Sequence, residues 1–191
     1  MPFLNDYNNK NPQKQLVNAY NVHIEPIGLY SKKYQSLEEI EEGSTVLISN
    51  STSDFGRALM LLRDAGLLTL KADFDPEGDN ANFSEIIIEN KKNLIFKENK
   101  PAADYLVPAY KNNEADLFII NSNFALEGNL NPLEDTIFIE KATDNPYVNI
   151  IATRAELLDS PKIKALIAVL KETAIKEFIN EKYQGSVINA S

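Results

Sequence analysis

One short run of apolar residues constrains this chain more than any other feature. Residues 116–120 read Asp-Leu-Phe-Ile-Ile, a pattern typical of a strand that is covered on both faces in a parallel sheet. Helical spacing is clearest between Asp54 and Gly66 and again from Pro161 onward. Further strands are predicted at 16–30, 45–48, 94–96, 136–140 and 147–153. Because strands alternate with helices, the sequence predicts an α/β fold.

Three segments between these elements carry weaker patterns. A capping-box pattern predicts a short helix at 37–41 that ends at Gly43. Residues 102–110 have helical spacing, and Pro108 is expected to kink the helix or end it early. The stretch 73–84 is rich in Asp, Asn, Gly and Pro, which predicts a surface loop.

Composition excludes several classes of function. The 191 residues carry a net charge of −9, which disfavours nucleic acid as a partner because phosphate backbones are repelled. The chain has no cysteine, so disulfides, thiolate metal sites and cysteine nucleophiles are excluded. The sequence contains no apolar run long enough to span a membrane and no visible signal peptide. A length of 191 residues suits one domain or two small lobes.

Residue patterns typical of enzymes are scarce. The single histidine, His23, lies among apolar neighbours in a predicted strand, a setting that more often indicates a structural role than a catalytic one. No glycine-rich phosphate loop, catalytic triad pattern or metal-ligand spacing is found. We therefore expect a protein that is not an enzyme and that uses no cofactor or metal.

A strand, a polar turn and a helix start follow one another at 46–59. Such a turn directs backbone N–H groups toward the edge of the sheet where α/β proteins bind ligands. Arg57 lies in the first turn of the helix, where its charge opposes the helix dipole. One interpretation is a clamp for a carboxylate, which arginine binds with two parallel hydrogen bonds. The other is a capped helix with Arg57 in a surface ion pair, and the sequence leaves both open.

Two asparagines are placed in an equally unusual way. Asn121 directly follows the apolar strand, and Asn149 falls inside a stretch where a buried strand would favour an apolar side chain. A buried amide must find hydrogen-bond partners, and two amides with one arginine suit a zwitterionic amino acid. The alternative is that Asn121 caps a helix and that Asn149 bonds a neighbouring loop.

Several segments in the same order resemble the methionine-binding (NlpA-type) lipoproteins, solute-binding components of ABC importers. The segments are 23–33, 50–59, 121–125 and 146–154. The resemblance covers nearly the whole chain and implies a two-lobed periplasmic-binding-protein-like fold, with methionine or a methionine-containing dipeptide in the cleft. The clamp arginine of that family corresponds to Arg57, and its two ligand-binding asparagines correspond to Asn121 and Asn149.

The chain departs from the family pattern at two further positions. Asp54 stands where the family has an asparagine, and Phe3 stands where it has a tyrosine. Both are predicted as possible ligand-binding residues. The family's signal peptide, its lipidated cysteine and the first strand–helix units of lobe I have no counterpart in this sequence, so we expect lobe I to be incomplete.

The resemblance also implies how the chain divides and what it does. Lobe II is predicted at 44–135, and a remnant of lobe I at 1–43 and 136–191, with crossovers near 31–43 and 136–147. The implied function is capture of methionine and its delivery to permease subunits, on the outer side of a membrane to which the intact family protein is anchored by lipid. The alternative is a degenerate or truncated relative that binds no ligand and acts as an envelope interaction protein.

Overall fold

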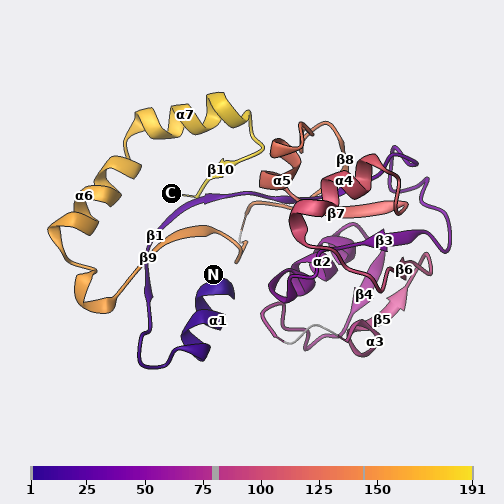
Figure 1. The fold of residues 1–191 in the computed structure, drawn as a ribbon, viewed down its shortest axis with the longest axis horizontal. Coiled ribbons are helices and arrows are strands. Elements are labelled where there is room, and N and C mark those ends of the chain that lie inside the picture. Colours follow the sequence, from indigo (N-terminus) through magenta and orange to yellow (C-terminus); the bar gives the residue numbers. More distant parts are fainter. Residues whose placement is uncertain (1, 79–81, 144, 191) are drawn as a thin grey trace. The chain divides into compact units, whose positions relative to one another are not determined.

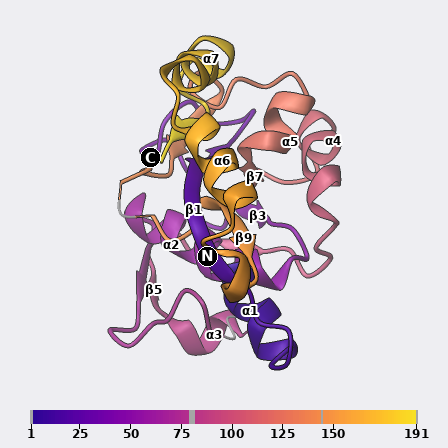
Figure 2. The same cartoon turned by 90° about the vertical axis from the view of Figure 1, so that its left-hand side faces the viewer.

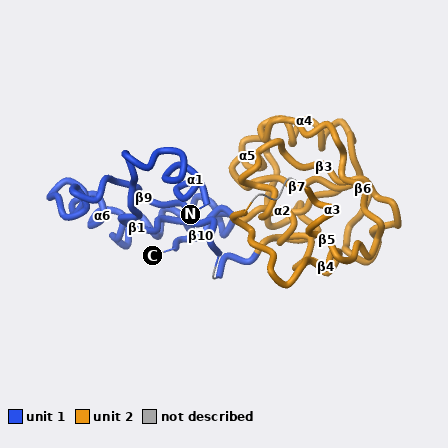
Figure 3. The backbone as a smooth tube through the Cα atoms, turned by 90° about the horizontal axis from the view of Figure 1, so that it is seen from below, with its two compact units in different colours: residues 1–25, 141–191 blue, residues 26–140 orange. Residues whose placement is uncertain are grey.

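A computed structural model describes residues 2–78, 82–143 and 145–190 of the chain. The chain divides into two compact units, which Figure 3 shows in different colours. Unit 1 comprises residues 1–25 and 141–191, and unit 2 comprises residues 26–140. The chain therefore passes between the units only twice, after Glu25 and after Glu140.

These bounds differ from the predicted lobes, 1–43 with 136–191 and 44–135. Unit 2 also contains β2 (Ile27–Tyr30) and β8 (Thr136–Ile139). The physical reason is backbone pairing, since β2 lies between β7 and β8 in one sheet and all of its residues are buried. The connections accordingly lie at the ends of these two strands, and the first is not within 31–43 as predicted.

Unit 2 is built on a five-stranded sheet with the order β6-β3-β7-β2-β8. Its other strands are β3 (Thr45–Leu47), β6 (Ile95–Phe96) and β7 (Leu117–Asn121). β3 runs parallel to both β6 and β7, whereas β2 runs antiparallel to β7 and β8. The apolar run at 117–120 is thus a buried central strand, as predicted, but the sheet is mixed rather than parallel.

Helices cover both faces of this sheet. In Figure 1, α2 (Thr52–Asp64) lies on one face, and α4 (Leu106–Lys111) and α5 (Ser122–Glu127) lie on the other. Alternate residues of the central strands serve two hydrophobic cores, as in β7, where Ile119 packs toward α2 and Phe118 toward α4. The α/β prediction is confirmed by this three-layer arrangement.

The helices that the sequence predicts in unit 2 agree with the structure only in part. Residues 37–41 form turns rather than the predicted helix, while α2 ends as predicted before Gly66, whose φ of +76° favours glycine. Pro108 lies in the first turn of α4, where a missing N–H is tolerated, so the helix continues to Lys111. A short 3-10 helix, η1 (Ala103–Tyr105), precedes α4.

A two-stranded antiparallel sheet in unit 2 was not predicted. It consists of β4 (Leu68–Leu70) and β5 (Ile87–Asn90), and α3 (Phe83–Ile86) precedes β5. The predicted loop 73–84 overlaps this region, and residues 79–81 lie outside the described part of the chain. Short, half-exposed strands of this kind have too few apolar residues to give a clear pattern.

Unit 1 contains a three-stranded antiparallel sheet with the order β10-β1-β9. Its elements are α1 (Pro2–Lys10), β1 (Val17–Ile24), β9 (Asn149–Thr153), η2 (Ala155–Leu157), α6 (Pro161–Leu170), α7 (Thr173–Tyr183) and β10 (Ile188–Asn189). Figure 2 shows α6 beside β1, which it contacts. The long helix predicted from Pro161 is broken into α6 and α7, because Glu172 has an extended backbone. Ser160 caps α6, as its hydroxyl accepts the Ile163 N–H.

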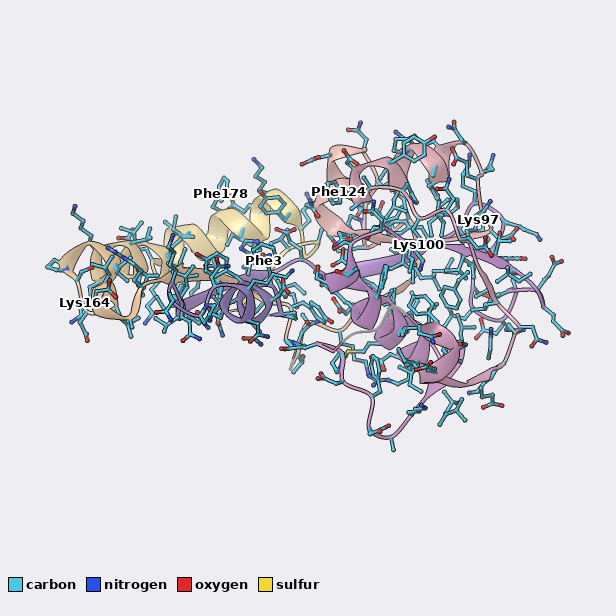
Figure 4. The ribbon with its side chains drawn as sticks, turned by 60° about the horizontal axis from the view of Figure 1, so that its bottom comes forward. Phe3, Lys97, Lys100, Phe124, Lys164 and Phe178 are labelled. Carbon is cyan, nitrogen blue, oxygen red and sulfur yellow. The ribbon has the colours of Figure 1, made fainter. Side chains whose placement is uncertain are left out.

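Buried residues are distributed very unequally between the units. Both hydrophobic cores lie in unit 2. The buried residues in the described part of unit 1 are Ile24, Thr153, Ile179, Ser186 and Val187. Large apolar side chains are exposed on its helices, including Phe3 on α1 and Phe178 on α7, which are labelled in Figure 4. Apolar burial therefore stabilises unit 2 far more than unit 1.

This inequality predicts different rates of hydrogen exchange in the two units. Amides of β7 and β2 should exchange most slowly, because their strands lie between two cores and open only with the whole unit. Amides of β1 and β9 should exchange faster. Exchange followed by mass spectrometry on the intact chain measures both sets together, and equal protection in the two sheets would contradict the prediction.

Candidate functional site

The topology of unit 2 brings several chain segments to one edge of its sheet. β3 and β7 are parallel, so both strands end at this edge, where α2 and α5 begin. β2 is antiparallel to β7 and starts at the same edge, with Ile27 opposite Asn121. β8 ends there too, since the Glu140 N–H donates to the Ile27 carbonyl at 2.9 Å. This is the edge at which α/β proteins bind ligands.

A small pocket lies at this edge and is lined only by residues of unit 2. Its polar lining comes from Ser49, Asp54 and Asn121. The apolar lining consists of Ile27, Ile48, Phe55, Ala58 and Ile119. The cavity measures about 10 Å³, which is close to the space that one water molecule needs. It therefore fits a single small polar group rather than a whole amino acid.

An aromatic cluster supports the wall of this pocket. Phe55, which lines the pocket, packs edge-on against Phe83, and Phe83 packs edge-on against Phe96, with centroid distances of 5.7 and 4.8 Å. The ammonium of Lys100, labelled in Figure 4, lies 4.5 Å from the Phe55 ring centroid. These contacts hold the first turn of α2 in place.

Asp54 places a carboxylate in the pocket, at the start of α2. The hydroxyl of Ser49 donates to it over a long distance, 3.4 Å. Burial raises the pKa of Asp54. The nearby positive charge of Arg57 and hydrogen bonds from Ser51 and Ser49 oppose this rise, and the negative charge of Glu140 adds to it. The net effect is a raised pKa, so the fold disfavours the ionised form of this carboxyl group.

Arg57 forms a buried ion pair with Glu140. The guanidinium donates from Nη2 to Oε2 at 2.6 Å and from Nε to Oε1 at 3.0 Å, and the two side chains are only 8% and 9% exposed. The predicted alternative of a surface ion pair is therefore wrong, because the pair is buried. Sequence reasoning missed Glu140 as the partner, since 83 residues separate the two and no local pattern links them.

Glu140 also connects the two segments through which the chain leaves unit 2. Its Oε2 accepts a hydrogen bond from the Ile27 N–H at 3.2 Å, next to the backbone hydrogen bond between the same residues. Nearby, the buried hydroxyl of Ser122 donates to the Pro26 carbonyl. The start of β2 and the end of β8 are thus fixed to the rest of unit 2.

Asn121 occupies the N-cap position of α5, as the alternative interpretation expected. Its side chain, however, makes no capping hydrogen bond, and it lines the pocket instead. The position is set by β7, whose last residue it is. Asn121 therefore lines the same pocket as Asp54.

Asn149 and Phe3 belong to unit 1. Asn149 is the first residue of β9 and is exposed, so the prediction that it lies inside a buried strand is wrong. Its Nδ2 is 3.3 Å from Nε2 of His23, its partner across the sheet, and the same His23 nitrogen is 2.8 Å from Oε1 of Glu25. Phe3 is 76% exposed on α1. The structure thus gathers Asp54, Arg57 and Asn121 in unit 2, and their convergence with Asn149 stays a prediction.

None of the helices in the described ranges combines the length and the apolar character that crossing a bilayer requires. Within the same part of the chain, histidine, aspartate and glutamate side chains form no group of three that could hold a metal ion.

Comparisons of the sequence and of the structure with known proteins point to the same family. The family model for the NlpA lipoprotein matches residues 1–191. The chain is 44% identical, over its full length, to a protein of Bacillus subtilis (strain 168) named methionine-binding lipoprotein MetQ. A crystal structure of a putative methionine-binding lipoprotein from that organism matches with a TM-score of 0.89 at 43% identity, covering 100% of this chain and 75% of that chain. A nutrient binding protein from Burkholderia cenocepacia, solved bound to methionine, matches with a TM-score of 0.86 at 34% identity and covers 100% and 76%.

The matched relatives are longer than this chain. It spans 68% of the Bacillus subtilis relative and 66% of the Escherichia coli (strain K12) protein named D-methionine-binding lipoprotein MetQ, to which it is 33% identical over 187 residues.

The raised pKa of Asp54 predicts that replacing this residue stabilises the fold. A carboxyl whose pKa is raised by folding contributes stability below its unfolded-state value, near 3.8, and this contribution is lost as the pH rises through the folded-state pKa. Asp54→Asn does not titrate, so at pH 7 it should melt at a higher temperature than the native chain. The difference should vanish below about pH 3.8. Asp64→Asn, at the more exposed end of the same helix, is the control and should show no such gain.

Breaking the buried ion pair should strongly destabilise unit 2. Glu140→Gln leaves the Arg57 charge buried without its countercharge, which typically costs about 3–5 kcal/mol. The matched control is Glu156→Gln, in the exposed pair Arg154–Glu156, where about 0–1 kcal/mol is expected. Chemical denaturation of the variants measures both losses. Similar losses of unfolding free energy in the two variants would show that burial does not make the Arg57–Glu140 pair more important for stability than an exposed pair.

Proposed function

Because the chain belongs to the NlpA lipoprotein family, we propose that it is a solute-binding protein that captures methionine or a closely related amino acid or dipeptide for an ABC importer. The observation that carries this proposal is the family match over residues 1–191, together with a solved relative at 34% identity that is bound to methionine. The reaction is binding and release, and no covalent step is part of it.

The edge of the unit 2 sheet supports an amino acid as the ligand. It combines a carboxylate, an amide and a guanidinium within a short distance, and these groups complement both charges of a zwitterion. We assign Arg57 to the ligand carboxylate, since a guanidinium can serve two carboxylates from two of its edges. Asn121 and Asn149 are assigned to hydrogen bonds with the ligand.

The partners follow from the same proposal. An importer needs permease subunits that accept the ligand, and we propose these as the protein partners. The relatives are named lipoproteins, so the place of action is the extracytoplasmic side of a membrane, with attachment through lipid. The net charge of −9 is consistent with a partner that is not nucleic acid.

A second candidate function is protein interaction without a ligand. The observation that favours it is the set of exposed apolar side chains on unit 1, among them Phe3, Val169 and Phe178. Exposed apolar surface is typical of interaction sites. Titration with methionine separates the two functions, because only the first gives saturable binding at one site.

Isothermal titration of the chain with L-methionine should give one binding site. Arg57→Ala should weaken the binding free energy of methionine by about 2–5 kcal/mol, as expected for loss of a charged hydrogen-bonded partner. Asn121→Ala leaves the ion pair intact and should cost about 1–3 kcal/mol. Arg154→Ala, at an exposed position, is the control and should bind as the native chain does. Circular dichroism verifies that each variant is folded. Absence of methionine binding by the native chain would refute the proposed function.

A further inference from the structure

The charges around the pocket do not balance. Arg57 and Glu140 neutralise each other within their ion pair, at 2.6 Å. Asp54 is a third charged group close enough to both for its pKa to respond to them. When all three are ionised, the group carries one negative charge in excess, and that charge lies on the residue that lines the pocket.

We infer that Asp54 recognises the positively charged amino group of the ligand, an assignment that rests on the proposed function and extends it to a specific residue. The cavity of about 10 Å³ accommodates one group of that size. Its polar lining consists of Asp54, Ser49 and Asn121, each of which has a side-chain oxygen that can accept a hydrogen bond. An ammonium group has three N–H donors and no acceptor, so it matches a wall of oxygen acceptors.

The same geometry disfavours an anionic group in this pocket. A ligand carboxylate inside the pocket would face the carboxylate of Asp54, whereas Arg57, to which we assign the ligand carboxylate, is not among the residues that line the pocket. The hydrogen bond that Asp54 accepts from Ser49 is long, at 3.4 Å. Ser51 donates a second hydrogen bond to this carboxylate, but the two serine hydroxyls do not offset its burial. A half-buried carboxylate in this setting gains more from a cation than from a neutral group.

Two ligands that differ only in the amino group test this inference. L-methionine carries the group, and 4-(methylsulfanyl)butanoate has the same skeleton without it. The native chain should bind methionine at least about tenfold more tightly than the analogue, as close opposite charges in a desolvated site commonly give a tenfold effect or more. In Asp54→Asn the ratio of the two affinities should fall about tenfold, because the amide keeps the shape and removes the charge.

The control is Asp64→Asn, the same substitution at the other end of α2, where the ratio should equal the native one. Three other outcomes count against the inference. Equal affinity of the native chain for both ligands overturns it without any variant. An unchanged ratio in Asp54→Asn also overturns it, while methionine binding by the native chain leaves the proposed function standing. If the native chain binds neither ligand, the proposed function and this inference both fail.

Discussion

The buried ion pair between Arg57 and Glu140 is the interaction on which the arrangement of unit 2 depends. It joins the second turn of α2, where Arg57 lies because the helix begins at Thr52 and not at Asp54 as predicted, to the end of β8. The Glu140 carboxylate also accepts a hydrogen bond from the N–H of Ile27 at the start of β2. Both connections of the chain to unit 1 begin directly beside these residues. One carboxylate therefore fixes the point at which the chain leaves unit 2 and the helix that carries the pocket residue Asp54.

A buried ion pair is stable only where its surroundings hold the two charges rigidly, and the two hydrophobic cores of unit 2 provide this rigidity. Charges taken out of water need close geometry and further hydrogen bonds to offset the lost hydration. The central strands β3, β7 and β2 are covered on both faces, so the sheet edge beneath the pair has little freedom to move. Unit 1 has few buried side chains and places Asn149 on an exposed strand end. The part of the candidate site that is rigidly held is thus the part that unit 2 carries.

The sequence predicted what depends on local pattern and missed what depends on distant contacts. The strand at 117–120, the helix predicted between Asp54 and Gly66 and observed as Thr52–Asp64, and the position of Asn121 at a strand end all followed from apolar spacing and turn residues. The partner of Arg57 did not, because no pattern connects two residues 83 positions apart. The same limit explains the unit bounds: whether β2 belongs to one unit or the other is decided by its neighbours in the sheet, which the sequence does not specify.

The pocket places a poorly solvated carboxylate where a neutral side chain would be easier to bury. Folding raises the pKa of Asp54, so ionisation of this residue works against the stability of unit 2. A neutral amide of the same shape would fit the first turn of α2 without that cost. Asp54 opposes stability, yet an aromatic cluster and a buried ion pair hold it at the ligand-binding edge of the sheet. Such an arrangement is typical of a residue that acts on a ligand. The apolar cores of unit 2 offset the cost, and the charge remains available for a cation that enters from solvent.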